Sequence, residues 1–244
     1  HAVLDVCKSL EKEGFAVTYI NIDKDGFVKL DELKKAITDK TILVSIIHAN
    51  NEIGTIQDIS AIGKICKEKN IVFHTDAVQS FTKVPIDVKK SNLALASFSA
   101  HKIHGPKGIG ALFVKKGIKL KKLIDGGAQE FNLRAGTENL PGAIGFAKAS
   151  ELIMNKDIDK MAELRDYFIT EIIKQISDTS LNGSNKNRLC NNISFSFRNV
   201  EGESVLLALN DKGIAVTTSS ACTSAKLEPS HVLSAIGLKP EDSH

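Results

Sequence analysis

Several features are scarce in this sequence, and each scarcity excludes a class of protein. The 244 residues carry 32 Lys and Arg against 29 Asp and Glu, so the formal charge of +3 is too small and too dispersed to indicate binding to nucleic acid. No apolar run approaches the roughly 20 residues that a membrane-spanning helix needs, and the first residues lack the apolar core of a signal peptide. We therefore expect no nucleic-acid partner and no membrane association.

Cysteine is also sparse. Cys7, Cys66, Cys190 and Cys222 lie far apart and form no C-x-x-C pair, which disfavours a zinc cluster or a disulfide framework. Reduced thiols fit this spacing better, so we expect a cytoplasmic protein. Cys7 and Cys66 fall on apolar helix stripes and are expected to be inert. Cys222 lies in a Ser, Thr and Ala loop, residues 217–229, and is the candidate for a reactive thiol.

What the sequence does contain predicts an α/β fold. Apolar periodicity predicts helices over residues 3–13, 30–38, 58–69, 140–155, 156–177, 202–211 and 230–236. It predicts strands over residues 15–22, 41–48, 71–75, 93–98, 108–114, 192–198 and 214–217. The alternation of the two indicates an open, mostly parallel sheet with flanking helices. We expect a large domain over residues 1–150 and a smaller α+β domain over residues 151–244.

Polar residues follow three consecutive predicted strands, and ligands bind beyond the carboxyl ends of the strands in such sheets. These residues are His48, Asn50, Asn51 and Glu52; Asp76, Gln79 and Ser80; and Ser99, His101, Lys102 and His104. Lys102 is the candidate for a Schiff-base lysine, because a partly desolvated amine loses its proton more easily and attacks aldehydes. The alternative is an ordinary surface lysine. A metal hydrolase is a further alternative, with the candidate ligands His48, His74, Asp76, His101 and His104. However, His101-x-x-His104 lacks the i, i+4 spacing of two helical metal ligands.

These motifs resemble those of the NifS/IscS-type cysteine desulfurases, which are pyridoxal-phosphate enzymes of fold type I with an aminotransferase-like large domain. The resemblance extends from His1 to His244. It rests on H-A-N-N-E-I-G at 48–54, H-T-D-A-V-Q-S at 74–80, S-F-S-A-H-K-I-H-G-P-K-G-I-G at 97–110, R-A-G-T at 134–137 and S-S-A-C-T-S-A at 219–225.

The resemblance implies how a pyridoxal 5'-phosphate ring would be held. Lys102 would bind the cofactor covalently as a Schiff base. Asp76 would pair with the pyridine nitrogen, which keeps the ring protonated and able to accept electrons. Gln79 would hydrogen-bond the phenolic oxygen of the ring, and Asn51 would also contact the cofactor.

The resemblance also implies a phosphate site and a dimer. Ser99 and His101 would bind the phosphate group of the cofactor. Thr137 would reach the phosphate of the neighbouring subunit, so that the site needs a homodimer. No metal is implied.

Cys222 is the catalytic nucleophile that the resemblance implies. It would attack the sulfur of a bound L-cysteine, leaving L-alanine and an enzyme persulfide that passes to an acceptor such as an iron–sulfur scaffold protein. The length of the 217–229 loop resembles that of the desulfurases that supply iron–sulfur cluster assembly. One alternative is a selenocysteine lyase or another pyridoxal-phosphate sulfur-group lyase, and another is an inactive fragment that serves only as an interaction domain.

The ends of the chain depart from the family pattern. By register, the family's ring-stacking histidine falls immediately before His1, or on His1 itself, and its carboxylate-binding arginine falls beyond His244. We therefore expect a fragment that lacks both ends and that is inactive by itself.

Overall fold

The structure, a computed structural model, describes residues 1–218 and 230–239. Its contacts form two compact units: a first unit of His1–Asp39, Ala49–Gln57 and Asp159–His244, and a second unit of Lys40–His48 and Asp58–Ile158. This grouping differs from a single boundary at residue 150, because two N-terminal segments pack with the C-terminal part. The division into a cofactor-binding domain over 1–150 and a small domain over 151–244 remains a prediction.

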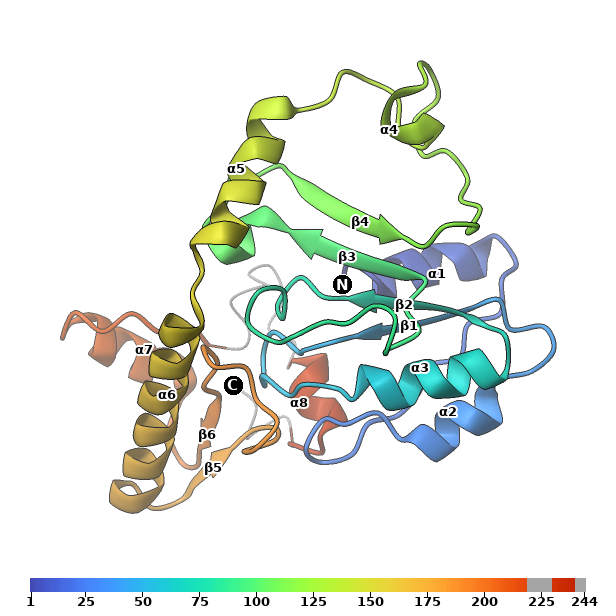
Figure 1. The fold of residues 1–244 in the computed structure, drawn as a ribbon. Helices are drawn as coiled ribbons and strands as arrows, with labels where there is room; N and C mark the ends of the chain where they lie inside the picture. Colours follow the sequence, from blue (N-terminus) through green and yellow to red (C-terminus); the bar gives the residue numbers. More distant parts are fainter. Residues whose placement is uncertain (219–229, 240–244) are drawn as a thin grey trace. The chain divides into compact units, whose positions relative to one another are not determined.

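The second unit is built on a four-stranded sheet in the order β1-β2-β3-β4 (Figure 1). Its strands are β1 (Leu43–Ile47), β2 (Val72–Asp76), β3 (Leu95–Ser99) and β4 (Gly110–Val114). The first three strands are parallel, and β4 pairs antiparallel with β3 from Leu95↔Val114 to Ser99↔Gly110. The predicted open, mostly parallel sheet is thus confirmed.

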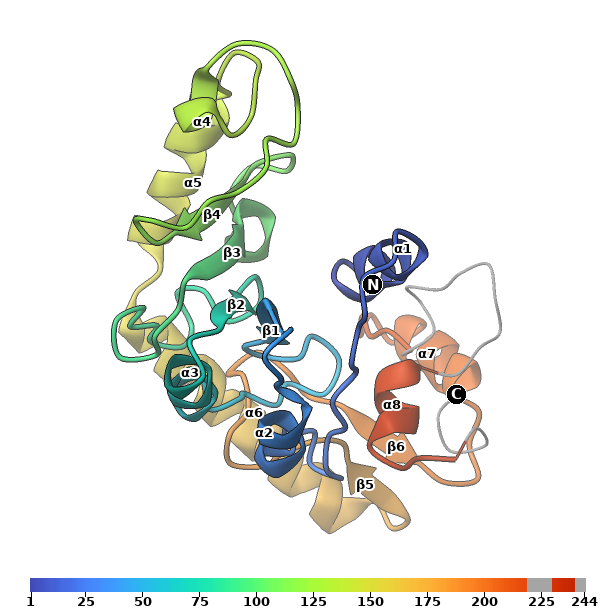
Figure 2. The same cartoon turned by 90° about the vertical axis from the view of Figure 1, so that its right-hand side faces the viewer.

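Helices cover this sheet, and the sequence explains where they begin. Helix α3 (Ile59–Glu68) packs against β2, and its N-cap Asp58 accepts hydrogen bonds from the backbone N–H groups of Ser60 and Ala61. Helix α5 (Leu140–Leu152) packs against the short 3-10 helix η1 (Ala100–Ile103). Both α3 and α5 lie beside the sheet in two perpendicular views (Figures 1 and 2). Phe73 of β2 is fully buried in the core of this unit.

The first unit contains most of the remaining helices and a small sheet. Its helices are α1 (Leu4–Lys12), α2 (Leu30–Ala36), most of α6 (Asn155–Gln175), α7 (Gly202–Asn210) and α8 (His231–Ala235). Strands β5 (Thr179–Leu181) and β6 (Phe195–Phe197) pair antiparallel. Ile53, Val232 and Leu233 form a buried cluster in this unit. Helix α4 (Gln129–Asn132) belongs to the second unit.

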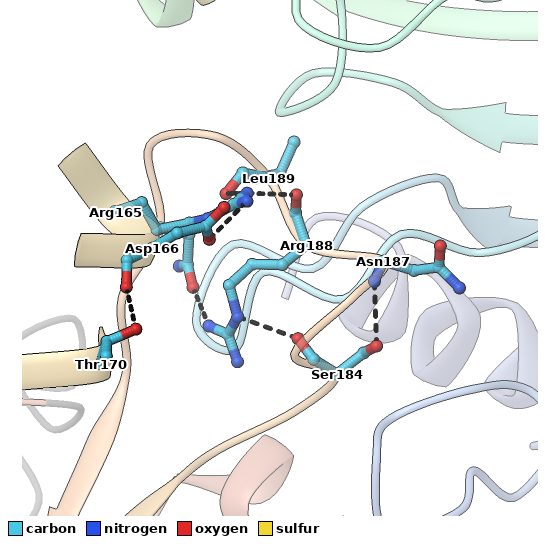
Figure 3. A network of polar contacts seen from close by, with 8 residues as sticks. Arg165, Asp166, Thr170, Ser184, Asn187, Arg188 and Leu189 are labelled. Atoms are coloured by element: carbon cyan, nitrogen blue, oxygen red, sulfur yellow. Dashed lines mark hydrogen bonds and ion pairs between the residues drawn. The ribbon is translucent and has the colours of Figure 1, made fainter. Parts of the chain in front are cut away.

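Two buried or nearly buried arginines organise the first unit (Figure 3). Arg165 of α6 donates from Nη1 to the backbone oxygens of Arg188 and Leu189, at 2.8 and 3.0 Å. Arg188 is 3% exposed, and its guanidinium donates to the backbone oxygens of Ser184 and Asn182 and to a side-chain amide. Burial lowers the pKa of Arg188 to about 10, and the positive charge of Arg165 acts in the same direction. The side chain therefore ties the loop before β6 together through neutral acceptors.

Two predicted strands are wrong. Residues 15–22 form no regular strand: their pairing is limited to the isolated bridge Ile22↔Val28. The side chains of Phe15 and Tyr19 are 50% and 49% exposed. Residues 214–217 are also without a strand partner among the described residues. Alternation alone does not create a neighbouring strand, whereas β5, which is only three residues long, was too short to detect by periodicity. In the described part of the chain, no helix has the length and apolar character needed to cross a membrane.

Candidate functional site

The candidate site lies at the carboxyl ends of β2 and β3. These adjacent strands run parallel, with Asp76 at the end of β2 opposite Ser97 of β3. Strand β3 ends at Ser99 and leads directly into η1, which carries His101 and Lys102. Because parallel strands end at the same edge of a sheet, an acid and an amine follow neighbouring strands at this edge. This matches the placement that the sequence predicts for Asp76 and Lys102.

A row of hydrogen bonds crosses the three parallel strands beside Asp76. The imidazole of His74, two residues before Asp76 on β2, lies 2.8 Å through Nδ1 from Ser45 Oγ of β1. Its Nε2 lies 2.9 Å from Ser97 Oγ of β3. Burial lowers the pKa of His74, and the negative charge of Asp76 opposes that shift in part. A neutral imidazole therefore shares one face of β2 with the Asp76 carboxylate, whose Oδ1 accepts from the N–H of Val78 at 2.9 Å.

A second histidine, His48, directly follows β1 and forms a hydrogen bond to the turn after β2. His48 is 3% exposed, and its Nδ1 lies 2.8 Å from the hydroxyl of the fully buried Ser80. The Ser80 hydroxyl also donates to the backbone oxygen of Ala77 at 3.3 Å. Burial lowers the pKa of His48 to about 4, so the ring is neutral at pH 7. His48 therefore acts as a structural contact within this edge.

The 3-10 helix η1 presents its polar residues to the outside and its apolar residues to the core. Ala100 and Ile103 are buried, whereas His101 and Lys102 are exposed. Ser99 Oγ lies 2.8 Å from His101 Nδ1, so the hydroxyl and the imidazole are next to each other. Ala100 and Ile103 thus anchor η1 in the core, while the amine of Lys102 and the imidazole of His101 remain accessible.

The other predicted site residues have different surroundings. Gln79 is partly buried in the turn after β2, and Thr137 is exposed in the loop before α5. Asn51 is exposed and belongs to the first unit, where its backbone oxygen accepts from Asn192 Nδ2 at 3.3 Å. His1 also belongs to the first unit, with Nδ1 3.1 Å from Asp5 Oδ2. The structure therefore gathers Asp76, Gln79, Ser99, His101 and Lys102 at one edge of the second unit.

The predicted thiol nucleophile, Cys222, lies outside the described residues. Of the cysteines that the structure describes, Cys66 and Cys190 are buried and Cys7 is partly buried. Burial raises the pKa of Cys66 to about 11, which agrees with the prediction that its thiol is inert.

One group near this edge escaped the sequence analysis. It is Lys83, whose ammonium donates to the backbone oxygens of Gln79 and Lys102 at 3.3 and 3.2 Å. A lysine in a polar loop carries no pattern that would distinguish it from a solvated one. His74 was named in the sequence analysis only within a motif and as a candidate metal ligand, and its contacts across the three strands were not predicted.

Several curated proteins similar to this chain are named cysteine desulfurase IscS. The chain is 57% identical over 247 residues to the cysteine desulfurase IscS of Dictyoglomus turgidum, covering 100% of this chain and 63% of that protein. It is 54% identical over 247 residues to the cysteine desulfurase IscS of Methanosarcina thermophila, covering 100% of this chain and 61% of that protein. The chain thus spans less than two thirds of the length of these relatives.

Solved structures agree with the sequence relatives, and a family model covers most of the chain. A protein described as NifS-like superimposes with a TM-score of 0.87 at 37% identity, over 99% of this chain and 64% of that one. A structure described as SspA in complex with cysteine gives 0.85 at 37% identity, over 99% of this chain and 67% of that one. The model of the aminotransferase class-V family matches residues 1–237. The chain therefore belongs to the aminotransferase class-V family.

Proposed function

We propose that the intact protein is a pyridoxal-phosphate-dependent cysteine desulfurase, which converts L-cysteine to L-alanine and keeps the sulfur as a persulfide on Cys222. The observation that carries this proposal is the parallel register of β2 and β3, which brings Asp76 and the Lys102 segment to one edge of the sheet. Similarity to proteins named cysteine desulfurase over the whole chain supports the choice of reaction.

The described residues fit the cofactor of this family. An aldehyde needs an amine, and Lys102 supplies an exposed one on a short helix with buried anchors. A protonated pyridine nitrogen needs an anion, and Asp76 supplies a partly buried carboxylate on the adjacent strand. A phosphate needs hydrogen-bond donors, which Ser99 and His101 supply next to Lys102. When bound, the cofactor supplies an electron sink that weakens bonds at the substrate's α and β carbons.

Each residue would then do one task. Lys102 would hold the cofactor through its Nζ, which must be neutral to react with an aldehyde. The carboxylate of Asp76 would balance the positive charge at the ring nitrogen, and Gln79 would orient the ring through its oxygen. Ser99 and His101 would hold the phosphate end, and Asn51 would add a further contact to the cofactor. Together these contacts orient the substrate's C–S bond for cleavage.

The sulfur transfer balances with Cys222 as the acceptor. Its thiolate attacks the sulfur atom of the bound cysteine, so that an S–S bond forms as the C–S bond breaks. The electron pair of the C–S bond stays with carbon, which takes up a proton as alanine forms. The net reaction converts L-cysteine and a protein thiol to L-alanine and a protein persulfide. No external oxidant or reductant is needed.

The proposal extends to partners and location. We infer a homodimer, in which Thr137 contacts the phosphate bound by the neighbouring subunit. An iron–sulfur scaffold or another protein thiol would accept the persulfide sulfur. We infer a cytoplasmic location from the expectation of reduced thiols.

The test uses the intact protein mixed with pyridoxal 5'-phosphate. The Schiff-base absorbance is expected in the wild type and in Lys107→Ala, which removes an exposed lysine of the same loop. It is expected to be absent from Lys102→Ala, and a persistent band in that variant would refute the lysine assignment. Cys222→Ser should keep the band and lose the persulfide formed from L-cysteine, measured by mass spectrometry. An unchanged persulfide in Cys222→Ser would assign the nucleophile to another cysteine.

A further inference from the structure

The turn that follows β2 contains a residue in an unfavourable conformation. Thr82 has a φ of 67°, in the left-handed region that β-branched residues rarely adopt. Its hydroxyl oxygen is buried and has no hydrogen-bond partner in the part of the chain that the structure describes. Strained conformations of this kind persist only where the surrounding structure fixes them. Residues 79–83, defined here as the clamp turn, therefore hold a shape that Thr82 does not favour.

Packing and backbone hydrogen bonds fix the clamp turn. The ring of Phe81 lies 4.7 Å, centroid to centroid, from that of Phe98 on β3 and 5.9 Å from that of Phe146 on α5. The N–H of Lys83 donates to the backbone oxygen of Ser80 at 2.9 Å. The backbone of Lys83 is consequently held against β3, and the direction in which its side chain leaves the turn is set.

The side chain of Lys83 joins the two segments that carry the candidate site. Its Nζ donates to the backbone oxygen of Gln79 at 3.3 Å, within the clamp turn, and to the backbone oxygen of Lys102 at 3.2 Å, on η1. Hydrogen bonds from an ammonium are stronger than those between neutral groups. The bond to Gln79 is partly buried, and the bond to Lys102 is exposed to solvent. One cation thus links the turn after β2 to the helix after β3.

Lys102 gains a defined backbone position from this contact. The last carbonyl groups of a helix have no partner within it, and η1 has only four residues. At its C-terminal end, the N–H groups of His104 and Gly105 both turn back to the oxygen of Ala100. The oxygen of Lys102 is instead paired by Lys83. The backbone of Lys102 is therefore fixed while its own side chain remains exposed.

We propose that Lys83 is a positioning residue, whose ammonium holds the backbone of Lys102 relative to Gln79 and so sets where the Lys102 amine meets an aldehyde. This inference rests on the proposed function, because it assumes that Lys102 is the residue that reacts. A shift of about 1 Å in a reacting group can cost about 100-fold in rate. Loss of the hydrogen bond from Lys83 to the oxygen of Lys102 should therefore slow the reaction measurably.

The experiment measures Schiff-base formation in the intact protein. The apo form is mixed with pyridoxal 5'-phosphate in a stopped-flow spectrophotometer, and the adduct is then reduced with borohydride and located by mass spectrometry. In Lys83→Met, we expect adduct formation at Lys102 to slow by about 10-fold or more. Lys83→Arg, which keeps a cationic donor, should recover most of the rate. Lys67→Met, which removes an exposed lysine of α3, should stay within about twofold of the wild type.

The outcomes separate the two proposals. A wild type that forms no adduct at Lys102 refutes the proposed function before any variant is compared. A wild-type rate in Lys83→Met, with the adduct still on Lys102, refutes the positioning role alone. If Lys83→Met fails to fold, the double variant Thr82→Gly with Lys83→Met removes the backbone strain at the same time. Slow adduct formation in this folded double variant, compared with Thr82→Gly, supports the inference, and equal rates overturn it.

Discussion

Acidification should destabilise the protein through His48. The ring is 3% exposed, and its pKa lies at about 4 in the folded protein against an ordinary value of 6.5. Between these two values the unfolded chain binds a proton that the folded protein does not bind. The free energy of unfolding therefore falls as the pH decreases below 6.5, and it stops falling below the folded pKa of about 4.

The magnitude follows from the two pKa values. One pKa unit corresponds to about 1.4 kcal/mol, so the complete shift is worth about 3 kcal/mol once the pH is well below the folded pKa. Between pH 8 and pH 5, the pKa shift of His48 lowers the free energy of unfolding by about 2 kcal/mol. This is a large fraction of the roughly 5–15 kcal/mol by which domains are stable. His74, whose pKa is also lowered by burial, adds to the loss in the same direction.

Urea unfolding of the apo protein at pH 8 and pH 5, followed by far-UV circular dichroism, measures this loss. His48→Asn removes the titrating group and should lose about 2 kcal/mol less than the wild type over this interval. His104→Asn is the matched control, because His104 is exposed and its φ of 62° is one that asparagine tolerates. It should follow the wild type. Equal losses in the wild type and in His48→Asn would show that His48 is not the group responsible.

Two further substitutions test the packing described above. Thr82→Gly should raise the free energy of unfolding by about 1 kcal/mol. Removing the left-handed strain and the unpaired buried hydroxyl should exceed the entropy cost of glycine. A lower urea midpoint in this variant would show that the conformation of Thr82 is not strained. Arg188→Met should lower the free energy of unfolding by about 3 kcal/mol, because it leaves buried acceptors such as the oxygens of Ser184 and Asn182 without a donor; an unchanged urea midpoint would show that these acceptors find other partners.

The central strands and the first helix of the second unit could be predicted because their signals are local. Apolar runs identified β1, β2 and β3 within a few residues, and Asp58 identified the start of α3 through its capping chemistry. The edge that gathers Asp76 and Lys102 then followed from the rule for parallel sheets. The roles of the individual site residues came from the family resemblance and remain proposals.

The remaining features depend on contacts between distant residues. Residues 15–22 alternate like a strand, but a strand exists only where a second segment offers backbone groups to it. The hydrogen bond from Lys83 to the oxygen of Lys102 joins residues 19 apart, and the contact between Ser45 and His74 spans 29 residues. The left-handed φ of Thr82 is likewise imposed by its surroundings, against the preference of threonine. Sequence patterns contain no record of such pairings.

The antiparallel direction of β4 has a consequence for the reactive segment. A parallel successor to β3 would require a crossover of a dozen or more residues, usually through a helix, that leaves the far end of the connection on the opposite edge of the sheet. Because β4 returns beside β3, Ser99 and Gly110 are paired with each other in the sheet, and they flank the segment 100–109. The segment that carries Lys102 is thus held at both of its ends by β-sheet pairing, which limits the movement of this segment without any bound molecule.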